Sequence, residues 1–238
     1  MNALAGKLGL LDDDIKQENK LLRLAEDLRT KILTPIEGDF QWHYSEADLS
    51  ADEALSADWR KWASFGPRSV WSKMQGHTWF AAEVVVPEGA KGKTLVLKFT
   101  SQWQDRPGTT DPQCLAYLDG HIAQAIDGNH TELVVARNAK PGSKRTLLVN
   151  AFTFFDRPLV GFKVEFMVRN ERAEKLYYDI MTPLEVATRL PQNDGRRHAI
   201  LNLVNEALRA LDRRDGVTPE FEASLGAAEK IAARIYKL

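Results

Sequence analysis

The stretch CLAYLDGHIAQAI (Cys114–Ile126) decides the fold class of this 238-residue chain. Two strand-like runs, Leu115–Leu118 and His121–Gln124, lie on either side of Asp119 and Gly120. An Asp-Gly pair between two such runs is a strong hairpin signal, because both positions tolerate positive φ angles. The stretch therefore predicts two antiparallel strands joined by a tight turn.

Similar runs lie on both sides of this hairpin. Alternating patterns rich in β-branched and aromatic residues occur at 79–86, 94–100, 114–118, 122–126, 133–136, 146–155 and 159–168. Proline and glycine separate several of these runs, as at Pro87-Glu88-Gly89 and Lys140-Pro141-Gly142. About seven strands at this spacing predict an antiparallel β-sandwich.

Helical periodicity precedes and follows the strands. Residues 14–33 form an amphipathic pattern that ends at Thr34-Pro35, since proline cannot continue a helix. Further helices are expected at 171–190, with a break or kink at Pro183, at 194–212, and from an N-cap at Thr218 to about Tyr236. The segment 36–76 has four tryptophans and is expected to be irregular. The prediction is an α+β architecture with a helix at 1–36, a sandwich at 37–170 and a helical segment at 171–238.

The composition excludes several classes of protein. Net charge is -1 and no run of basic residues is dense enough to bind phosphates, so nucleic acid is not an expected partner. No stretch reaches the ~18 consecutive apolar residues that span a bilayer, and the N-terminus lacks a signal-peptide pattern. Cys114 is the only cysteine, so no internal disulfide can form. A cytoplasmic protein is expected.

Several blocks resemble the bacterial and vacuolar type of glycoside hydrolase family 38 α-mannosidases. The most specific is the pair of segments 116–120 and 124–132, which is similar to a "Y-x-D-G … Q-G-x-D-x-N-H-x-E" hairpin and loop, with Ala125 in place of a glycine. The blocks at 76–80, 176–179 and 205–212 are similar to other parts of the same N-terminal region. The resemblance extends from the first helix to the last.

This resemblance implies a non-catalytic N-terminal region. The family binds zinc in its catalytic domain through a motif that opens with His-x-Asp. None of the five histidines in this chain has an aspartate two positions after it. The implied partner is therefore the catalytic domain of a parent α-mannosidase, which would carry the zinc and follow Leu238. No catalytic residue, metal ligand or cofactor is expected in this chain. A homo-oligomer and a mannose-containing glycan are further implied partners.

A polar loop carries the main candidate site residues, Asp127, Asn129, His130 and Glu132. Two carboxylates in a pocket could support glycoside hydrolysis. The alternative is that Asp127 shapes the turn and Glu132 bonds loop backbone. A zinc site would need three or four ligands, and no second histidine lies at a supporting spacing. The loop is therefore expected to face a neighbouring domain or the entrance for the sugar.

Aromatic residues offer a second candidate site. Trp79 and Trp103, with Trp71, Phe80 and Tyr117, could form a platform for a sugar ring, and sandwiches with this strand pattern resemble galactose-binding-like jelly rolls. The alternative is that these rings belong to the core. The C-terminal helices leave a similar choice between a local bundle and a docking surface.

The expected function is that of an accessory domain of an α-mannosidase, which braces the catalytic barrel or an oligomer and lines the sugar entrance. A stand-alone carbohydrate-binding module is the alternative. A third hypothesis, an independent hydrolase, predicts turnover by this chain alone.

Overall fold

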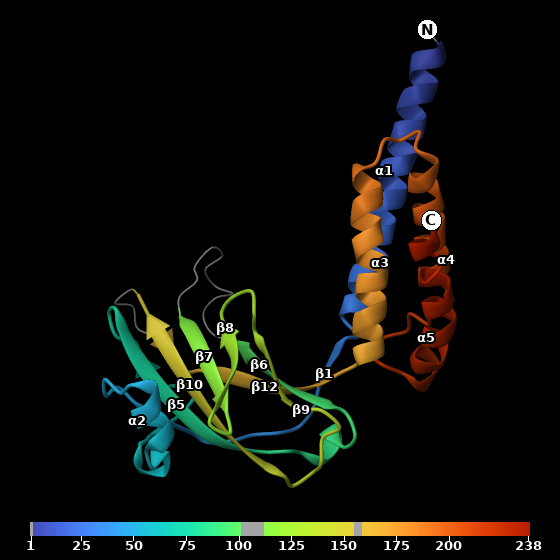
Figure 1. Cartoon of the computed structure of the whole chain (residues 1–238). Helices are drawn as coiled ribbons and strands as arrows, with labels where there is room; N and C mark the ends of the chain where they lie inside the picture. Colours follow the sequence, from blue (N-terminus) through green and yellow to red (C-terminus); the bar gives the residue numbers. More distant parts are fainter. Residues whose placement is uncertain (1, 101–111, 155–158) are drawn as a thin grey trace. The chain divides into compact units, whose positions relative to one another are not determined.

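The computed structural model describes residues 2–100, 112–154 and 159–238, with side chains from Lys16 onward. The chain divides into two compact units, one formed by Met1–Thr34 with Asn170–Leu238 and the other by Pro35–Arg169. The first unit is helical and the second holds the sandwich (Figure 1). The N-terminal and C-terminal helices thus share one unit although the whole sandwich separates them in sequence.

Two antiparallel sheets build the second unit. The larger sheet has the order β3-β2-β5-β10-β7-β8, with bounds Ala63–Phe65, Trp42–Ser45, Gly76–Val85, Lys144–Thr153, Gln113–Leu118 and His121–Ile126. The smaller sheet has the order β1-β12-β6-β9, with bounds Leu33–Pro35, Lys163–Arg169, Thr94–Thr100 and Glu132–Ala136. A further pair joins β4 (Val70–Trp71) to β11 (Leu159–Val160), and a 3-10 turn, η2, spans Glu88–Ala90.

Alternating side chains of both sheets form the sandwich core. Phe80 of β5 and Val149 of β10 meet Leu97 of β6 and Phe166 of β12, and all four are almost fully buried. The opposite face of β5 is also covered, because Trp79 and Ala81 pack with Ala54 of α2 (Ala51–Ser56) and with Trp59. The predicted α+β class and antiparallel sandwich are confirmed.

The hairpin that indicated the fold has the expected turn. Leu118 pairs with His121, and Asp119 and Gly120 between them have φ angles of 50° and 82°. Both angles lie in the left-handed region that suits Asp and Gly in a two-residue turn. Asp119 also accepts a hydrogen bond from Thr146 N at 2.8 Å, which ties the turn to β10.

The structure differs from the sequence-based expectation in the segment 36–76 and at 159–168. The segment 36–76 was expected to be irregular, but it contains β2, β3, β4, α2 and the 3-10 turn η1 (Trp59–Lys61). Ser50 and Glu53 close α2 with a capping box, a signal that the short length of the helix concealed. The single strand expected at 159–168 is split into β11 and β12 at Gly161, whose φ is +66°.

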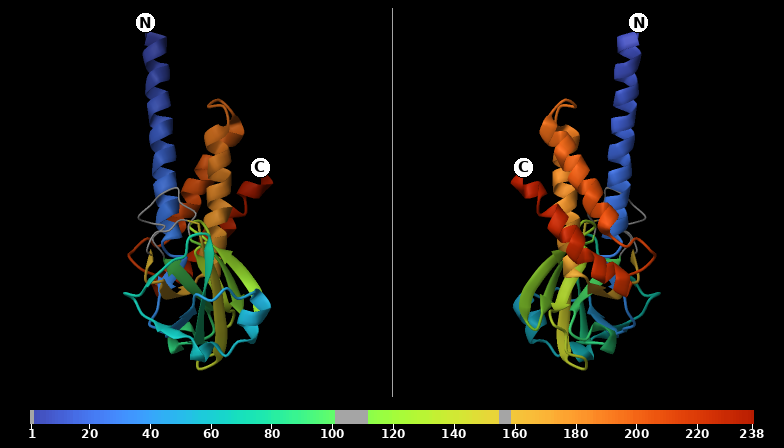
Figure 2. Two further views of the ribbon diagram at one scale, coloured as in Figure 1. Left: turned by 90° about the vertical axis from the view of Figure 1, so that its left-hand side faces the viewer. Right: turned by 90° about the vertical axis from the view of Figure 1, so that its right-hand side faces the viewer.

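Four helices pack around a core of their own in the first unit (Figure 2). They are α1 (Asn2–Arg29), α3 (Glu171–Arg189), α4 (Gly195–Ala210) and α5 (Pro219–Ala232), followed by η3 (Ile235–Lys237). Side chains of Asn170, Asp194 and Thr218 cap the last three helices, and Pro219 occupies the first turn of α5 as expected. Among the described helices, none has the length and apolar composition needed to cross a lipid bilayer.

A buried lysine holds the connection between α4 and α5. The Nζ of Lys31 donates to the carbonyl oxygens of Arg214 and Gly216, each at 2.6 Å, and lies 5.2 Å from the centre of the Phe221 ring. These contacts satisfy a charge that would otherwise be costly to bury. They fix the loop against the end of α1.

The same loop contains a carboxylate whose protonation is coupled to folding. The side chain and backbone N–H of Arg214 bond to Asp212 and hold its pKa at about 2, below its ordinary 3.8. A lowered pKa in the folded state stabilises the protein above the ordinary pKa, and this stabilisation is lost as the pH falls toward 2.

Asp212→Asn is therefore expected to lower the urea midpoint of helix unfolding at neutral pH, as followed by circular dichroism. The difference from the wild type should shrink between pH 4 and pH 2, the window of the lowered pKa of Asp212. Asp215→Asn, a change at an exposed neighbour, should leave the midpoint unchanged. A deficit of Asp212→Asn that stays constant down to pH 2 would contradict this coupling.

Candidate ligand-binding pocket

A pocket of about 700 Å³ opens in the sandwich unit. Its described walls come from the segment entering β2, the loop after β3, the end of β6 and the region of β11 and β12, namely Asp39, Phe40, Gln41, Trp42, Phe65, Gly66, Pro67, Thr100, Val160, Gly161, Phe162, Lys163, Val164 and Phe166. This volume falls in the range of ~300–1,000 Å³ typical of small-molecule sites. The pocket is large enough for a small organic ligand.

Packed aromatic rings form the floor of the pocket. The ring centre of Phe40 lies 4.9 Å from that of Trp42 and 5.6 Å from that of Phe166. Trp42 in turn lies 5.6 Å from Phe162, and its indole N–H donates to the Phe162 carbonyl at 3.3 Å. Edge-to-face and tilted contacts of this kind fix ring positions. The floor is therefore apolar and formed in advance of any ligand.

Two glycines allow the walls to approach each other. A Cβ at Gly38 would lie 2.5 Å from the Phe166 ring. Gly161 has a φ of +66°, and a Cβ there would lie 2.6 Å from the Pro67 carbonyl oxygen. Its own carbonyl accepts the indole N–H of Trp71 at 2.9 Å. The shape of the pocket thus depends on positions where a side chain does not fit.

Gln41 and Asp39 place hydrogen-bond acceptors on the wall. The Nε2 of Gln41 donates to the carbonyls of Trp42 and Phe65 at 2.9 and 2.8 Å. Both amide hydrogens are then used, and Oε1 remains as an acceptor in a fixed orientation. The Oδ1 of Asp39 accepts from Phe40 N at 2.8 Å, which leaves its second oxygen to accept from a ligand.

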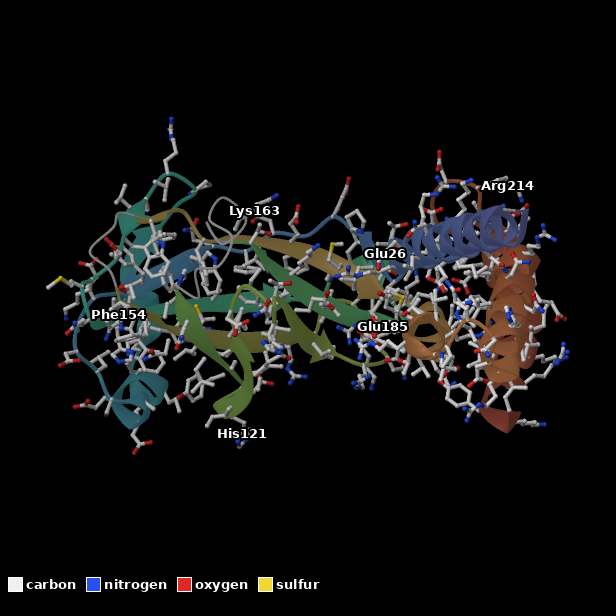
Figure 3. The ribbon with its side chains drawn as sticks, turned by 90° about the horizontal axis from the view of Figure 1, so that it is seen from above. Glu26, His121, Phe154, Lys163, Glu185 and Arg214 are labelled. Carbon is white, nitrogen blue, oxygen red and sulfur yellow. The ribbon has the colours of Figure 1, made fainter. Side chains whose placement is uncertain are left out.

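Lys163 is the other charged residue among the described lining residues. Its Nζ donates to Glu165 Oε1 at 2.9 Å, an exposed ion pair on the same strand that uses one of the three N–H groups of the ammonium. Figure 3 shows Lys163 and His121 on opposite sides of the sandwich. The hairpin of β7 and β8 is thus remote from this wall.

The predicted polar loop forms a turn between β8 and β9. Asp127 Oδ1 accepts from the backbone N–H groups of Asn129 and His130, each at 2.8 Å, and lies 3.0 Å from His130 Nδ1. The hydrogen bond from Asn129 is the main cause that lowers the pKa of Asp127. These contacts describe a turn closed by a side chain.

The other predicted site residues lie elsewhere. Glu132 bonds to Arg169 at 2.7 Å. Trp79 has only 1% of its surface exposed, packs under α2 and donates its indole N–H to the Leu49 carbonyl at 3.1 Å, so it offers no ring face to a ligand. Trp103 lies outside the described residues. None of the described candidates lines the pocket.

Sequence reasoning missed the residues that do line it. Asp39, Gln41 and Phe40 lie in a segment that was expected to be irregular, and their partners Phe65 and Phe166 are distant in sequence. The available signal was the run Gly38-Asp39-Phe40-Gln41-Trp42, in which polar and aromatic residues alternate directly after a glycine. Among the described residues, no group of three or more His, Cys, Asp or Glu side chains could hold a metal ion.

No family model matches the chain, and no curated protein matches it. Among solved structures, a Lactobacillus rhamnosus β-glucuronidase aligns with 14% identity and a TM-score of 0.42, over 58% of this chain and 29% of that one. The apo β-glucuronidase of Ruminococcus gnavus aligns with 13% identity and a TM-score of 0.39, over 59% and 29%. The matched region thus spans less than a third of either enzyme.

These findings overturn the resemblance to family 38 α-mannosidases. The solved structures are β-glucuronidases, and the sequence comparisons provide no support for an α-mannosidase. The motifs that suggested the family, around Asp119-Gly120 and Asp127-Gly128-Asn129, are accounted for by turn geometry. Such turns are needed in any antiparallel sandwich of short strands, so they do not identify a family.

Proposed function

We propose that this chain is a non-catalytic accessory region of a glycoside hydrolase and that its sandwich binds a sugar unit in the pocket. The observation that carries the proposal is the combination of an aromatic floor with fixed acceptors on Gln41 and Asp39. A sugar ring has apolar C–H faces and a rim of hydroxyl donors, which match these two surfaces. A cytoplasmic location is part of the proposal, because the single Cys114 fits a reducing compartment.

The acidic residues favour binding over catalysis. Glycoside hydrolysis ordinarily requires two carboxyl groups that flank the scissile bond, ~5 Å apart or more. Asp39 is the only carboxylate among the described residues that line the pocket. The catalytic groups of the proposed hydrolase would therefore belong to another region or another chain.

A bracing role is the second candidate function. Val70 and Val160 pair across β4 and β11 and have 57% and 52% of their surface exposed. Exposed apolar residues on neighbouring strands are suited to contact with another domain. Such a role requires no affinity for sugars.

Titration of the whole chain with glucose, mannose and their disaccharides, followed by NMR or calorimetry, tests the proposal. Saturable binding is expected, and Gln41→Ala should weaken it about three- to tenfold through the loss of one hydrogen-bond acceptor. Gln113→Ala, a matched change on β7 outside the described pocket wall, should have no effect. Flat titrations with every sugar would reject the binding function and favour bracing.

A further inference from the structure

The N-terminal part of α1 extends beyond the helices that pack against the rest of it (Figure 2). The N–H of Asn170, just before α3, donates to the Ile32 carbonyl at 2.8 Å. Further along, the Tyr177 hydroxyl of α3 donates to Glu26 at 3.1 Å, so the two helices are antiparallel. Because α3 ends about 12 residues after Tyr177, its last turn lies beside about residue 14 of α1. None of the other described helices of this unit runs beside residues 2–13.

The sequence of this segment has the heptad repeat abcdefg of a coiled coil. Leu8 and Ile15 take the a positions. Leu4 and Leu11 take the d positions, and we call these four residues the α1 seam. At ~100° per residue the α1 seam is a stripe about 60° wide. This is the narrow stripe of a coiled coil, whereas a helix face packed in a globular core is ~100° wide or more.

The α1 seam differs from the helix face that the bundle buries. That face carries Leu21, Leu24 and Leu28, and helical periodicity places the seam roughly a third of a turn away from it. The projecting segment also contains Gly6 and Gly9, each of which disfavours a helix by about 1 kcal/mol relative to alanine. A helix of this length is marginal in water on its own. A partner that covers the seam would stabilise it.

The charges beside the α1 seam suit a second copy of the same chain. Lys7 takes the g position before the heptad in which Asp12 takes the e position. In a parallel pair of helices, g of one chain lies beside e of the next heptad of the other, so Lys7 would meet Asp12 of the second copy twice. A lipid surface is a poorer partner, because the run Asp12-Asp13-Asp14 would face its negative charge.

We propose that two copies of this chain associate through the α1 seam, which forms a short parallel coiled coil. The seam lies in the helical unit and the pocket lies in the sandwich unit, so this association is independent of the proposed sugar binding. With only about two heptads in contact, the dimer should dissociate on dilution.

Sedimentation equilibrium of the whole chain from about 5 to 500 µM tests the association. The average mass is expected to rise from that of one chain toward that of two. Leu11→Asp places a charge in the seam and should raise the dissociation constant at least about tenfold. Leu10→Asp is the matched control, because the neighbouring c position lies outside the seam, and it should change the constant by no more than about twofold.

Exchange of the two charges tests the parallel orientation. Lys7→Glu and Asp12→Lys should each weaken the dimer about two- to tenfold, and the double variant should restore it, because each g–e pair is then oppositely charged again. An antiparallel pair would not be restored, since it places g beside g. A monomer at every concentration, or equal dissociation constants for Leu11→Asp and Leu10→Asp, would overturn the proposal. Monomers that bind vesicles of acidic phospholipid through the seam would overturn it in favour of a lipid surface.

Discussion

Phe80→Ala is expected to destabilise the sandwich unit by about 3–5 kcal/mol, the cost of removing a large buried aromatic side chain. Phe80 is fully buried, and its ring centre lies 4.8 Å from Trp71, 4.9 Å from Phe162 and 5.0 Å from Phe65. These rings come from β3, from β4 and from the pocket wall, so the cavity left by alanine would loosen all of them. Urea unfolding followed by tryptophan fluorescence measures the effect.

Tryptophan fluorescence reports on this unit alone. All 6 tryptophans lie within residues 35–169, so circular dichroism at 222 nm can follow the helices separately. Phe154→Ala is the matched control, because Phe154 has 52% of its surface exposed and should change stability by no more than about 0.5 kcal/mol. Similar losses for the two alanine variants would contradict the assignment of the core.

Gly161→Ala is expected to cost about 2–5 kcal/mol and to abolish sugar binding. An alanine at a φ of +66° is strained by about 1–2 kcal/mol. Its Cβ would also lie 2.6 Å from the backbone oxygen of Pro67, and overpacking of this kind adds about 1–3 kcal/mol. Because Gly161 and Pro67 both line the pocket, relief of this contact would move one wall away from the other.

Gly142→Ala separates the contribution of backbone strain from that of the close contact with Pro67. Gly142 has a φ of +77°, but no atom lies within 4 Å of the position that a Cβ would occupy. The Gly142→Ala variant should therefore be destabilised only by backbone strain, at a cost of about 1–2 kcal/mol, and should keep the affinity for sugar. If Gly161→Ala behaved like Gly142→Ala in both measurements, the close approach of Pro67 would not shape the pocket.

Local signals allowed much of the architecture to be predicted from the sequence. Asp119-Gly120 indicated the hairpin because the turn requires positive φ angles, and Thr218-Pro219 indicated the start of α5 because capping depends on adjacent residues. In both cases the determining contacts lie within a few positions of the signal. The alternating strands were predictable for the same reason, since one buried face imposes a period of two.

The pocket could not be predicted in this way, because its shape depends on contacts between distant segments. The Phe166 ring leaves no room for a side chain at position 38, and the Pro67 carbonyl leaves none at position 161, so both positions hold glycine. Nothing adjacent to either glycine in sequence indicates these neighbours. The aromatic residues gave an ambiguous signal as well, because Trp79 and Trp42 both lie on strands and only Trp42 lines the pocket.

The central claim, that a sugar occupies this pocket, is tested most directly by mapping chemical-shift changes on a ¹⁵N-labelled sample of the whole chain during titration with methyl glucoside. Saturable changes concentrated at Asp39–Trp42 and at Gly161 and Phe162, which line the pocket, are expected. Saturable changes centred instead on the turn at Asp127–His130 or on the α2 face would contradict it.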